Sequence, residues 1–411
     1  MNIDRARCTI TLKSLESGEF KKHKESADVH RNYGILWPEK VLEIDTSWDV
    51  DIPIVEEIEL ARFLNVSKVW IRYEGANKTG SMKDYPVKAA VLDGEKNNAL
   101  NYSVVSSGNH AASLAYFTQK VNKKCVVFVP ASTSKLPILS SFENVQVVAV
   151  RDAIFEDVYR LAQKVQLPDT YNANVSNDFL MTQFSSASKQ ILDTLASDLP
   201  THIIAGVGNG TYIAGLIFGF DYLNQQGIKA VPVGMKGAFP AEEAFLKGVS
   251  LWEYEDFLYG EDDISSAEGS IACASYSMPQ LIHAVRKSNG FPLGGIVNQD
   301  ISNAYDFLYE KTTSFRLGYI PEPTGIMSLA AVLKHRQVFK REDKLLLSFT
   351  GAGYKDLDGI KKFGGRYKTD ILEKIDQKPS SSILYGTSDP QRILFVEKNI
   401  KPELISELLR K

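Results

Sequence analysis

Cysteine and histidine are scarce in this chain of 411 residues, and they are scattered. The three cysteines, Cys8, Cys125 and Cys273, lie far apart, in no spacing typical of a disulfide framework or a metal site. The six histidines form no cluster with them, so no zinc motif is present. We therefore expect no bound metal and a reduced, cytoplasmic environment.

Long apolar runs and a strong charge of one sign are absent as well. No apolar run approaches the roughly 20 residues that span a bilayer. The charged stretch that begins at Met1 lacks the apolar core of a secretion signal. The formal net charge of −3 gives no general attraction to nucleic acid or acidic membranes. These absences leave a small molecule as the expected partner, with neither nucleic acid nor membrane.

What is present is a regular alternation of strand-like and helix-like segments, which begins near Ile54. Apolar runs predict strands at 68–73, 102–106, 125–129, 145–150, 202–207, 230–233 and 344–348. Helical spacing predicts helices at 56–63, 85–92, 110–120, 154–165, 185–196 and 212–223. This alternation indicates an α/β fold whose functional residues lie at the C-terminal ends of its strands.

One polar turn stands out between a predicted strand and a predicted helix. It reads Glu-Gly-Ala-Asn-Lys-Thr-Gly-Ser-Met-Lys-Asp over residues 74–84. Backbone N–H groups at a helix start are unpaired and face a crevice, and the amine of Lys83 would reach over it. We expect Lys83 to hold a cofactor aldehyde as a Schiff base, although most lysines are solvated surface charges.

Three later turns are also rich in small polar residues. In the turn at 106–110, Asn109 can donate through its amide, or can simply be a good first residue of a helix. Glycines at 206–211 have the composition of a phosphate cradle, though tight packing explains many such turns. In the turn at 348–356, Thr350 can offer a neutral hydroxyl to a ring nitrogen. Together the four turns supply what pyridoxal phosphate requires: an amine, an amide, a phosphate site and a hydroxyl.

The turns resemble the signatures of threonine synthases. The run at 74–84 is similar to their Glu-Gly-x-Asn-Pro-Thr-Gly-Ser-Phe-Lys-Asp signature, with Lys78 in place of proline and Met82 in place of phenylalanine. The runs at 107–113, 208–210 and 350–356 are similar to their other motifs, in the same order. Pro323-Thr324-Gly325 stands where relatives often have Pro-Ser-Ser or Pro-Ser-Gly. The resemblance covers roughly residues 34–360 and is specific for the cofactor.

This resemblance implies a fold type II enzyme dependent on pyridoxal 5′-phosphate, with two three-layer α/β/α domains and the cofactor between them. The large domain would comprise residues 1–96 and 190–365, and the small domain residues 97–189. Residues 366–411 would form a C-terminal extension that follows a linker-like run at 379–382. A homodimer is the habit of the family.

The resemblance also assigns roles to individual residues. Lys83 would be the catalytic residue and the cofactor's Schiff-base lysine, and Asn109 would hydrogen-bond the cofactor's 3′ oxygen. Thr350 would face the pyridine nitrogen. The cofactor phosphate would be held by Gly208, Asn209, Gly210 and Thr211. The expected substrate-binding residues are Arg72, Ser81, Ser107 and His110.

The substrate is less well specified than the cofactor. Threonine synthases bind the phosphate of O-phosphohomoserine, and relatives carry an Arg-x-Glu-Gly-Gln-Lys-Thr stretch for which residues 179–186 offer neither arginine nor lysine. A lost charged hydrogen bond is typically worth about 1.5–3 kcal/mol. Either another cation replaces the arginine, or the substrate is not phosphohomoserine.

Several functions therefore stay open. The first is a lyase or synthase that removes a β or γ leaving group from an amino acid, above all a threonine synthase-type loss of phosphate followed by addition of water. Within this class, a β-replacing enzyme resembling cysteate or cysteine synthases and a deaminating relative are alternatives. A nucleotide-binding oxidoreductase built on the turn at 206–210 leaves Lys83 unexplained. A non-catalytic relative that binds the cofactor is a remote alternative.

Overall fold

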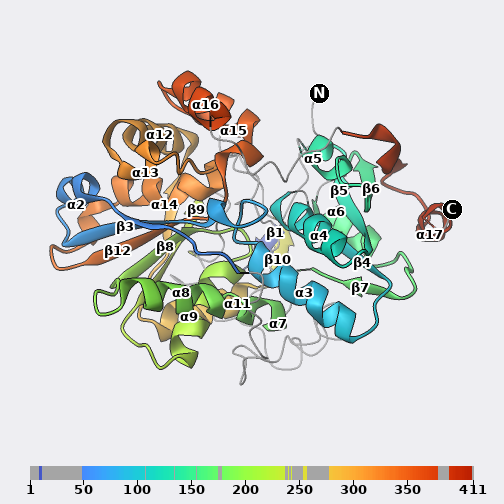
Figure 1. Ribbon diagram of the computed structural model, residues 1–411, viewed down its shortest axis with the longest axis horizontal. Coiled ribbons are helices and arrows are strands. Elements are labelled where there is room, and N and C mark those ends of the chain that lie inside the picture. Colours follow the sequence, from blue (N-terminus) through green and yellow to red (C-terminus); the bar gives the residue numbers. More distant parts are fainter. Residues whose placement is uncertain are drawn as a thin grey trace.

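The structure is a computed structural model whose two main sheets lie side by side, with helices on both faces of each (Figure 1). It describes residues 9–11, 49–106, 108–133, 135–153, 155–174, 178–236, 239, 242, 253–256, 277–377 and 388–409. The linker-like run at 379–382 lies outside these residues, as does most of the N-terminal stretch. A short antiparallel pair joins β1 (Thr9–Thr11) to β10 (Glu253–Asp256).

The larger sheet has six strands, of which five run parallel. Its order is β11 (Leu293–Ile296), β9 (Lys229–Met235), β8 (His202–Gly206), β12 (Lys344–Phe349), β3 (Lys68–Tyr73) and β2 (Ile54–Glu56). The edge strand β2 runs antiparallel to its neighbour. Every residue of β8 is buried, as expected for a strand covered on both faces.

The smaller sheet has five strands, which run parallel to one another. Its order is β13 (Ile393–Glu397), β6 (Val145–Arg151), β5 (Lys124–Pro130), β4 (Asn101–Val105) and β7 (Thr170–Asn172). The edge strand β13 comes from the end of the chain and pairs with β6 in register from Ile393 to Glu397. The predicted C-terminal extension is therefore partly built into this sheet.

Helices cover both faces of each sheet, which gives two three-layer α/β/α units (Figure 1). One face of the six-stranded sheet packs against α2 (Ile58–Leu64), α12 (Asn298–Lys311), α14 (Pro323–Lys334), α15 (Leu357–Phe363) and α16 (Lys368–Gln377). The other face packs against α8 (Ser185–Leu195), α9 (Thr211–Tyr222) and α11 (Met278–Lys287). The five-stranded sheet packs against α3 (Asp84–Lys96), α4 (Asn109–Lys120) and α5 (Leu136–Ser140) on one face, and α6 (Phe155–Ala162) and α17 (Pro402–Leu408) on the other.

Short helices complete the chain. They are η1 (Glu74–Ala76), α7 (Asp178–Thr182), α13 (Thr313–Arg316), η4 (Arg336–Val338), η5 (Gly353–Lys355) and η6 (Pro390–Arg392). The strands and helices predicted from apolar spacing are all present, with end shifts of a few residues. The predicted α/β fold is therefore confirmed.

The predicted domain boundary at residue 97 differs from the packing. Helix α3 precedes that boundary, yet its Val87, Ala90 and Val91 pack into the apolar core of the five-stranded sheet. The boundary at residue 366 also divides units that the structure joins, because β13 belongs to that same sheet. A boundary read from the sequence follows chain order, whereas packing follows the burial of apolar faces.

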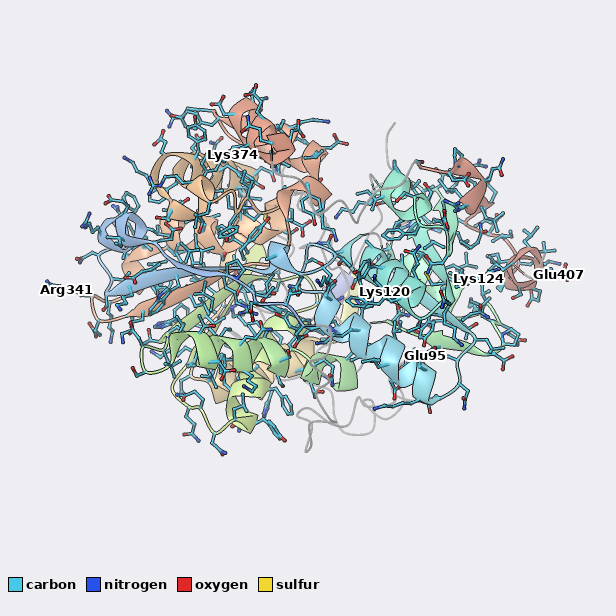
Figure 2. The ribbon with its side chains drawn as sticks, in the orientation of Figure 1. Glu95, Lys120, Lys124, Arg341, Lys374 and Glu407 are labelled. Carbon is cyan, nitrogen blue, oxygen red and sulfur yellow. The ribbon has the colours of Figure 1, made fainter. Side chains whose placement is uncertain are left out.

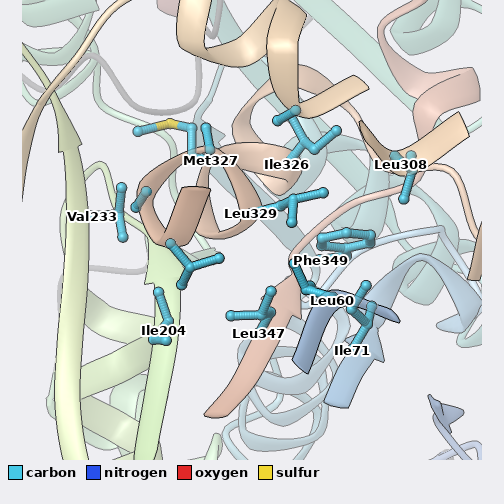
Figure 3. Packing of buried hydrophobic residues seen from close by; sticks show 14 of the residues in the cluster. Leu60, Ile71, Ile204, Val233, Leu308, Ile326, Met327, Leu329, Leu347 and Phe349 are labelled. Carbon is cyan, nitrogen blue, oxygen red and sulfur yellow. The ribbon is translucent and has the colours of Figure 1, made fainter. Parts of the chain in front are cut away.

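Strands β3, β12 and β8 carry the core of the larger unit. Leu345 and Leu347 of β12 point to the face covered by α14, and Leu346 points to the opposite face, as the period of two in a strand requires. Figure 3 shows Leu347 close to Ile71 and Phe349 on the face covered by α14. This packing fixes the strands against one another and so fixes the turns that follow them.

Charged side chains lie on the outer surface of both units. Figure 2 labels examples of both signs: Glu95, Lys120, Lys124, Arg341, Lys374 and Glu407. Opposite charges are interspersed, consistent with the small net charge of the whole chain.

Leu347→Ala tests the importance of the central strand. Leu347 is fully buried, and removing its side chain is expected to cost about 2–5 kcal/mol of unfolding free energy through lost burial and cavity formation. Urea denaturation measures this loss, with the exposed Val338→Ala as the matched control. Equal midpoints for the two variants would contradict the assigned core.

Candidate active site

Three of the predicted turns follow three neighbouring parallel strands. Strand β12 lies between β3 and β8, and its Phe349 pairs with Tyr73 while its Ser348 pairs with Ala205. Because the carboxyl ends of parallel strands meet at one edge of a sheet, the turns that follow them lie side by side. The turn that bears Thr350 therefore lies between the Lys83 turn and the glycine-rich turn after β8.

The Lys83 turn and the Thr350 turn are joined by backbone hydrogen bonds. The N–H of Met82 donates to the carbonyl oxygen of Thr350 at 3.0 Å, and the N–H of Ala352 donates to that of Gly80 at 2.9 Å. Gly80 has a φ of +80°, a left-handed conformation that favours glycine. These bonds fix the spacing between Lys83 and Thr350.

A buried carboxylate shapes the Lys83 turn from within. Asp84 accepts hydrogen bonds from the backbone N–H of Thr79 (2.8 Å), from the Thr79 hydroxyl and from the hydroxyl of Ser113 on α4 (2.8 Å). The Lys355 amine donates to the Thr79 carbonyl oxygen at 2.6 Å. The aspartate at the end of the predicted motif is thus a brace that ties the turn to the smaller unit and holds Lys83 in place.

The amine of Lys83 lies in a desolvated environment at the start of α3. Burial lowers its pKa to about 8, against the opposing effect of the Glu322 carboxylate. About half of the amine is therefore neutral at about pH 8, where a lysine of ordinary pKa is almost wholly charged. A neutral amine is what attack on an aldehyde requires.

The glycine-rich turn after β8 leads directly into α9, which begins at Thr211. Gly210 has a φ of +81°, and a Cβ there would lie 2.6 Å from Leu281, so the backbone passes where a side chain would not fit. Gly208 and Asn209 are partly exposed, and Thr211 is buried. Unpaired N–H groups at the start of this helix provide the dipole and donors that a phosphate requires.

Asn109 is a residue that the smaller, five-stranded unit contributes to the site. It is the first residue of α4, and its Nδ2 donates to Oε1 of Glu322 at 2.6 Å. The amide nitrogen carries two hydrogens, so one stays available for a ligand oxygen. Its Oδ1 is buried and has no hydrogen-bond partner among the described residues. An amide that the protein satisfies only in part is consistent with a ligand-facing group.

Glu322 is a buried residue of this site that the sequence reasoning missed. It precedes Pro323, the first residue of α14, and its backbone N–H donates to the Gly351 carbonyl oxygen at 2.9 Å. The only signal in the sequence was a charged residue directly before a helix-starting proline. Lys135, which precedes α5, was missed as well, and its amine lies 3.9 Å from Oε2 of Glu322.

The predicted substrate contact of Arg72 does not fit its position. Arg72 is fully buried on β3, where its guanidinium donates to Glu74 (2.7 Å), Tyr85 (2.8 Å) and Gln190 (2.8 Å). A side chain on a central strand points to one covered face of the sheet, whereas the turns lie at its end. Arg72 therefore stabilises the buried residues next to the turn and does not face the site.

His110 also differs from its predicted role as a donor to substrate. Its Nε2 lies 2.6 Å from the carbonyl oxygen of Ala173, and burial lowers the pKa of the ring to about 3, assisted by the charge of Lys83. The neutral ring must donate through Nε2, which leaves Nδ1 as an acceptor.

Ser81 is fully buried beside Lys83, and its hydroxyl oxygen accepts from the Lys83 backbone N–H at 3.3 Å. Its predicted contact with the substrate stays a prediction. Ser107 lies outside the described residues.

The donor set fits pyridoxal phosphate: an amine of lowered pKa, a hydroxyl-bearing turn, an incompletely satisfied amide and a helix start with a glycine cradle. A family model described as "Pyridoxal-phosphate dependent enzyme" matches residues 49–351. The chain belongs to this family. Its cofactor is pyridoxal 5′-phosphate, as the four turns predicted.

Comparison with individual proteins indicates which members of the family this chain resembles. The threonine synthase of Methanocaldococcus jannaschii is 26% identical over 318 residues, which cover 74% of this chain and 75% of the relative. Among solved structures, a threonine deaminase from T.th. is similar with a TM-score of 0.61 and 22% identity, over 74% of this chain and 92% of that one. A pyridoxal 5′-phosphate-dependent aspartate racemase has the same TM-score at 18% identity, over 84% of this chain and 97% of that one. The chain is thus a threonine synthase-like fold type II enzyme.

Two further properties concern only the residues that the structure describes. They contain no group of three or more His, Cys, Asp or Glu side chains placed to bind a metal ion. Within the same ranges, no helix has the length and apolar character of a membrane span.

His110→Gln tests the buried neutral histidine. The folded pKa of about 3 lies below the ordinary 6.5, so only the unfolded chain takes up this proton as pH falls from about 6.5. The contribution of His110 to the free energy of unfolding is fully present above about pH 6.5. Below that pH it falls by up to about 1.4 kcal/mol per pH unit. Urea unfolding in mildly acidic buffer is expected to show a shallower loss for His110→Gln than for the wild type. His335→Gln, whose ring also contacts a carbonyl oxygen, is the control, and identical slopes would contradict the assignment.

Proposed function

We propose that this chain eliminates phosphate from an O-phospho amino acid and adds water in its place, the reaction type of a threonine synthase. The family and its cofactor are given above, and the reaction, the leaving group and the nucleophile are the proposal. The observation that carries it is the position of Lys83. Its amine of lowered pKa lies on a turn that backbone hydrogen bonds join to the hydroxyl-bearing turn of Thr350.

Lys83 supplies the acid–base chemistry in this proposal. Pyridoxal phosphate, when bound, acts as an electron sink for charge that develops at the substrate Cα. The Lys83 amine takes the proton from Cα and then from Cβ, so that the bond between Cγ and the phosphate oxygen can break. Water adds its hydroxyl at Cβ, and protons return to Cα and Cγ. A pKa of about 8 lets one amine both accept and return these protons.

Thr350 supports elimination over transamination. It is buried, and its place next to the Lys83 turn is fixed by the hydrogen bond from Met82. A threonine hydroxyl facing the pyridine nitrogen does not stabilise a protonated ring as a carboxylate would. Charge then accumulates less on the ring, which favours loss of a leaving group.

Lys135 and Lys355 support an anionic leaving group. The run at 179–186 lacks the arginine and lysine of relatives, but these two buried amines lie close enough to each other that Lys135 lowers the pKa of Lys355. The pKa of Lys355 is lowered to about 8, chiefly by burial. An arriving phosphate would be stabilised by the two amines and would draw Lys355 to its charged form.

A deaminase is the second candidate. Nδ1 of His110 is an acceptor, and an acceptor suits a substrate hydroxyl better than a phosphate oxygen. The solved threonine deaminase shares the fold, although fold alone does not select the reaction. The same site is also compatible with a β-replacing enzyme, which would use a nucleophile other than water.

The cofactor assignment is tested with Lys83→Ala. Addition of pyridoxal phosphate to the wild-type chain is expected to produce a visible absorption band that borohydride removes, with mass added at Lys83. Lys83→Ala should give no band, because the amine that binds the aldehyde is absent. Lys124→Ala changes an exposed lysine and is the control. Borohydride-stable attachment at another lysine would contradict the role of Lys83.

The substrate assignment is tested by product analysis. O-phosphohomoserine and O-phosphoserine are supplied separately, and phosphate release is measured together with the amino-acid product. We expect phosphate release with at least one of them, and a drop of at least about tenfold in kcat/KM for Lys135→Ala through loss of a charged contact. Turnover of serine or threonine to a keto acid, with neither phospho amino acid consumed, would replace the proposal with the deaminase.

A further inference from the structure

A buried charged cluster joins the two units beside Lys83, and the reaction scheme above does not use its carboxylate. Glu322 is only 5% exposed and comes from the larger unit, at the start of α14. Its Oε1 accepts from Asn109 at 2.6 Å, and its Oε2 lies 3.9 Å from the amine of Lys135. Both partners come from the smaller unit, so this one carboxylate contacts two elements across the junction.

Two glycines make room for the cluster. A Cβ on Gly351 would lie 2.4 Å from Oε1 of Glu322 and 3.1 Å from Nδ2 of Asn109. A Cβ on Gly108 would lie 2.9 Å from the Lys135 amine. Contacts this short exclude a side chain at either glycine without movement of the cluster. The carboxylate is therefore packed directly against the backbone that follows Thr350.

This placement relates Glu322 to both residues expected to hold the cofactor ring. Asn109 is proposed to contact the 3′ oxygen, and Thr350, next to Gly351, is proposed to face the pyridine nitrogen. Glu322 contacts Asn109 through its side chain and Gly351 through its backbone N–H. Glu322 therefore links the two contacts directly.

We infer that Glu322 is a positioning residue, which orients the Asn109 amide toward the cofactor from across the junction between the two units. The inference rests on the proposed role of Asn109. The same carboxylate also acts on the charge of the Lys83 amine, which gives the placement of Glu322 a second readout.

The charge effect has a definite sign. Burial lowers the pKa of Lys83, and the Glu322 carboxylate opposes this. The other charged groups around the turn are Lys355, Lys135 and Asp84; Asp84 is already held by Thr79 and Ser113. His110 is neutral there. Removal of the Glu322 charge therefore takes away the stabilising partner and lowers the pKa of Lys83 further.

A role limited to stability predicts a different result. If the cluster only joined the units, Glu322→Gln would change unfolding and leave the Lys83 amine unaltered, and folded Glu322→Ala would bind the cofactor as tightly as the wild type. A glutamine keeps an oxygen that accepts from Asn109 but carries no charge, whereas alanine removes both. The two variants therefore separate the orienting effect from the charge effect.

The test uses the full-length chain freed of cofactor, as wild type, Glu322→Gln and Glu322→Ala, with the exposed Glu342→Gln as the matched control. Limiting acetic anhydride at a series of pH values labels neutral amines, and mass spectrometry of the Lys83 peptide gives its half-labelling pH. The dissociation constant of pyridoxal phosphate is measured separately by absorbance. Far-UV circular dichroism establishes that each variant is folded.

We expect half-labelling of Lys83 to move down by about half a pH unit or more in Glu322→Gln. Its cofactor dissociation constant should stay within about twofold of wild type. In Glu322→Ala the dissociation constant should rise by about tenfold, because Asn109 loses the oxygen that accepts its hydrogen bond. The control should match wild type in both measurements.

An unchanged half-labelling pH in Glu322→Gln overturns the charge effect. A dissociation constant equal to that of the wild type in folded Glu322→Ala overturns the orienting effect. If Glu322→Ala does not fold, a tenfold rise in the dissociation constant of Glu322→Gln overturns that effect instead. Failure of the proposed function is distinguishable, because it would appear in the product analysis and leave the labelling of Lys83 unaffected.

Discussion

The shared register of three parallel strands is the constraint on which the site depends. Strands β3, β12 and β8 are paired side by side, so their final residues reach the same edge of the sheet. A slip of one residue would turn every side chain of a strand to the opposite face and move its turn along the edge. The apolar side chains of these strands, buried against α14 on one face and α9 on the other, prevent such a slip.

A second constraint joins the smaller unit to this edge. Asp84 binds Ser113 of α4, and Glu322 binds Asn109 at the start of that same helix. Both carboxylates are buried, and each accepts a hydrogen bond from a side chain of α4 in the smaller unit. Burial that would be costly for an isolated charge is thereby tolerated. The same burial lowers the pKa of Lys83, so the forces that join the units also prepare its amine for chemistry.

In the proposed site, cofactor and substrate are held by different parts of the molecule. The proposed cofactor contacts come from turns that the sheet holds in fixed places. The leaving group would meet side chains such as Lys135, at the beginning of a short helix in the other unit. A threonine deaminase and an aspartate racemase share this fold, which shows that the arrangement of strands is compatible with several reactions. A few polar side chains around Lys83 must therefore decide among them.

The sequence by itself determined the α/β alternation, the four polar turns and the identity of the cofactor, because these depend on local spacing and on short motifs. It also singled out the turns of Lys83 and Thr350, which the sheet brings side by side. Only the tertiary structure decided the environments: Arg72 is buried among Glu74, Tyr85 and Gln190, His110 donates to Ala173 and leaves Nδ1 as an acceptor, and Glu322 meets Asn109 over a separation of 213 residues. Such pairings depend on how the two units pack, and burial and hydrogen bonding between distant segments leave no periodic signal in the chain.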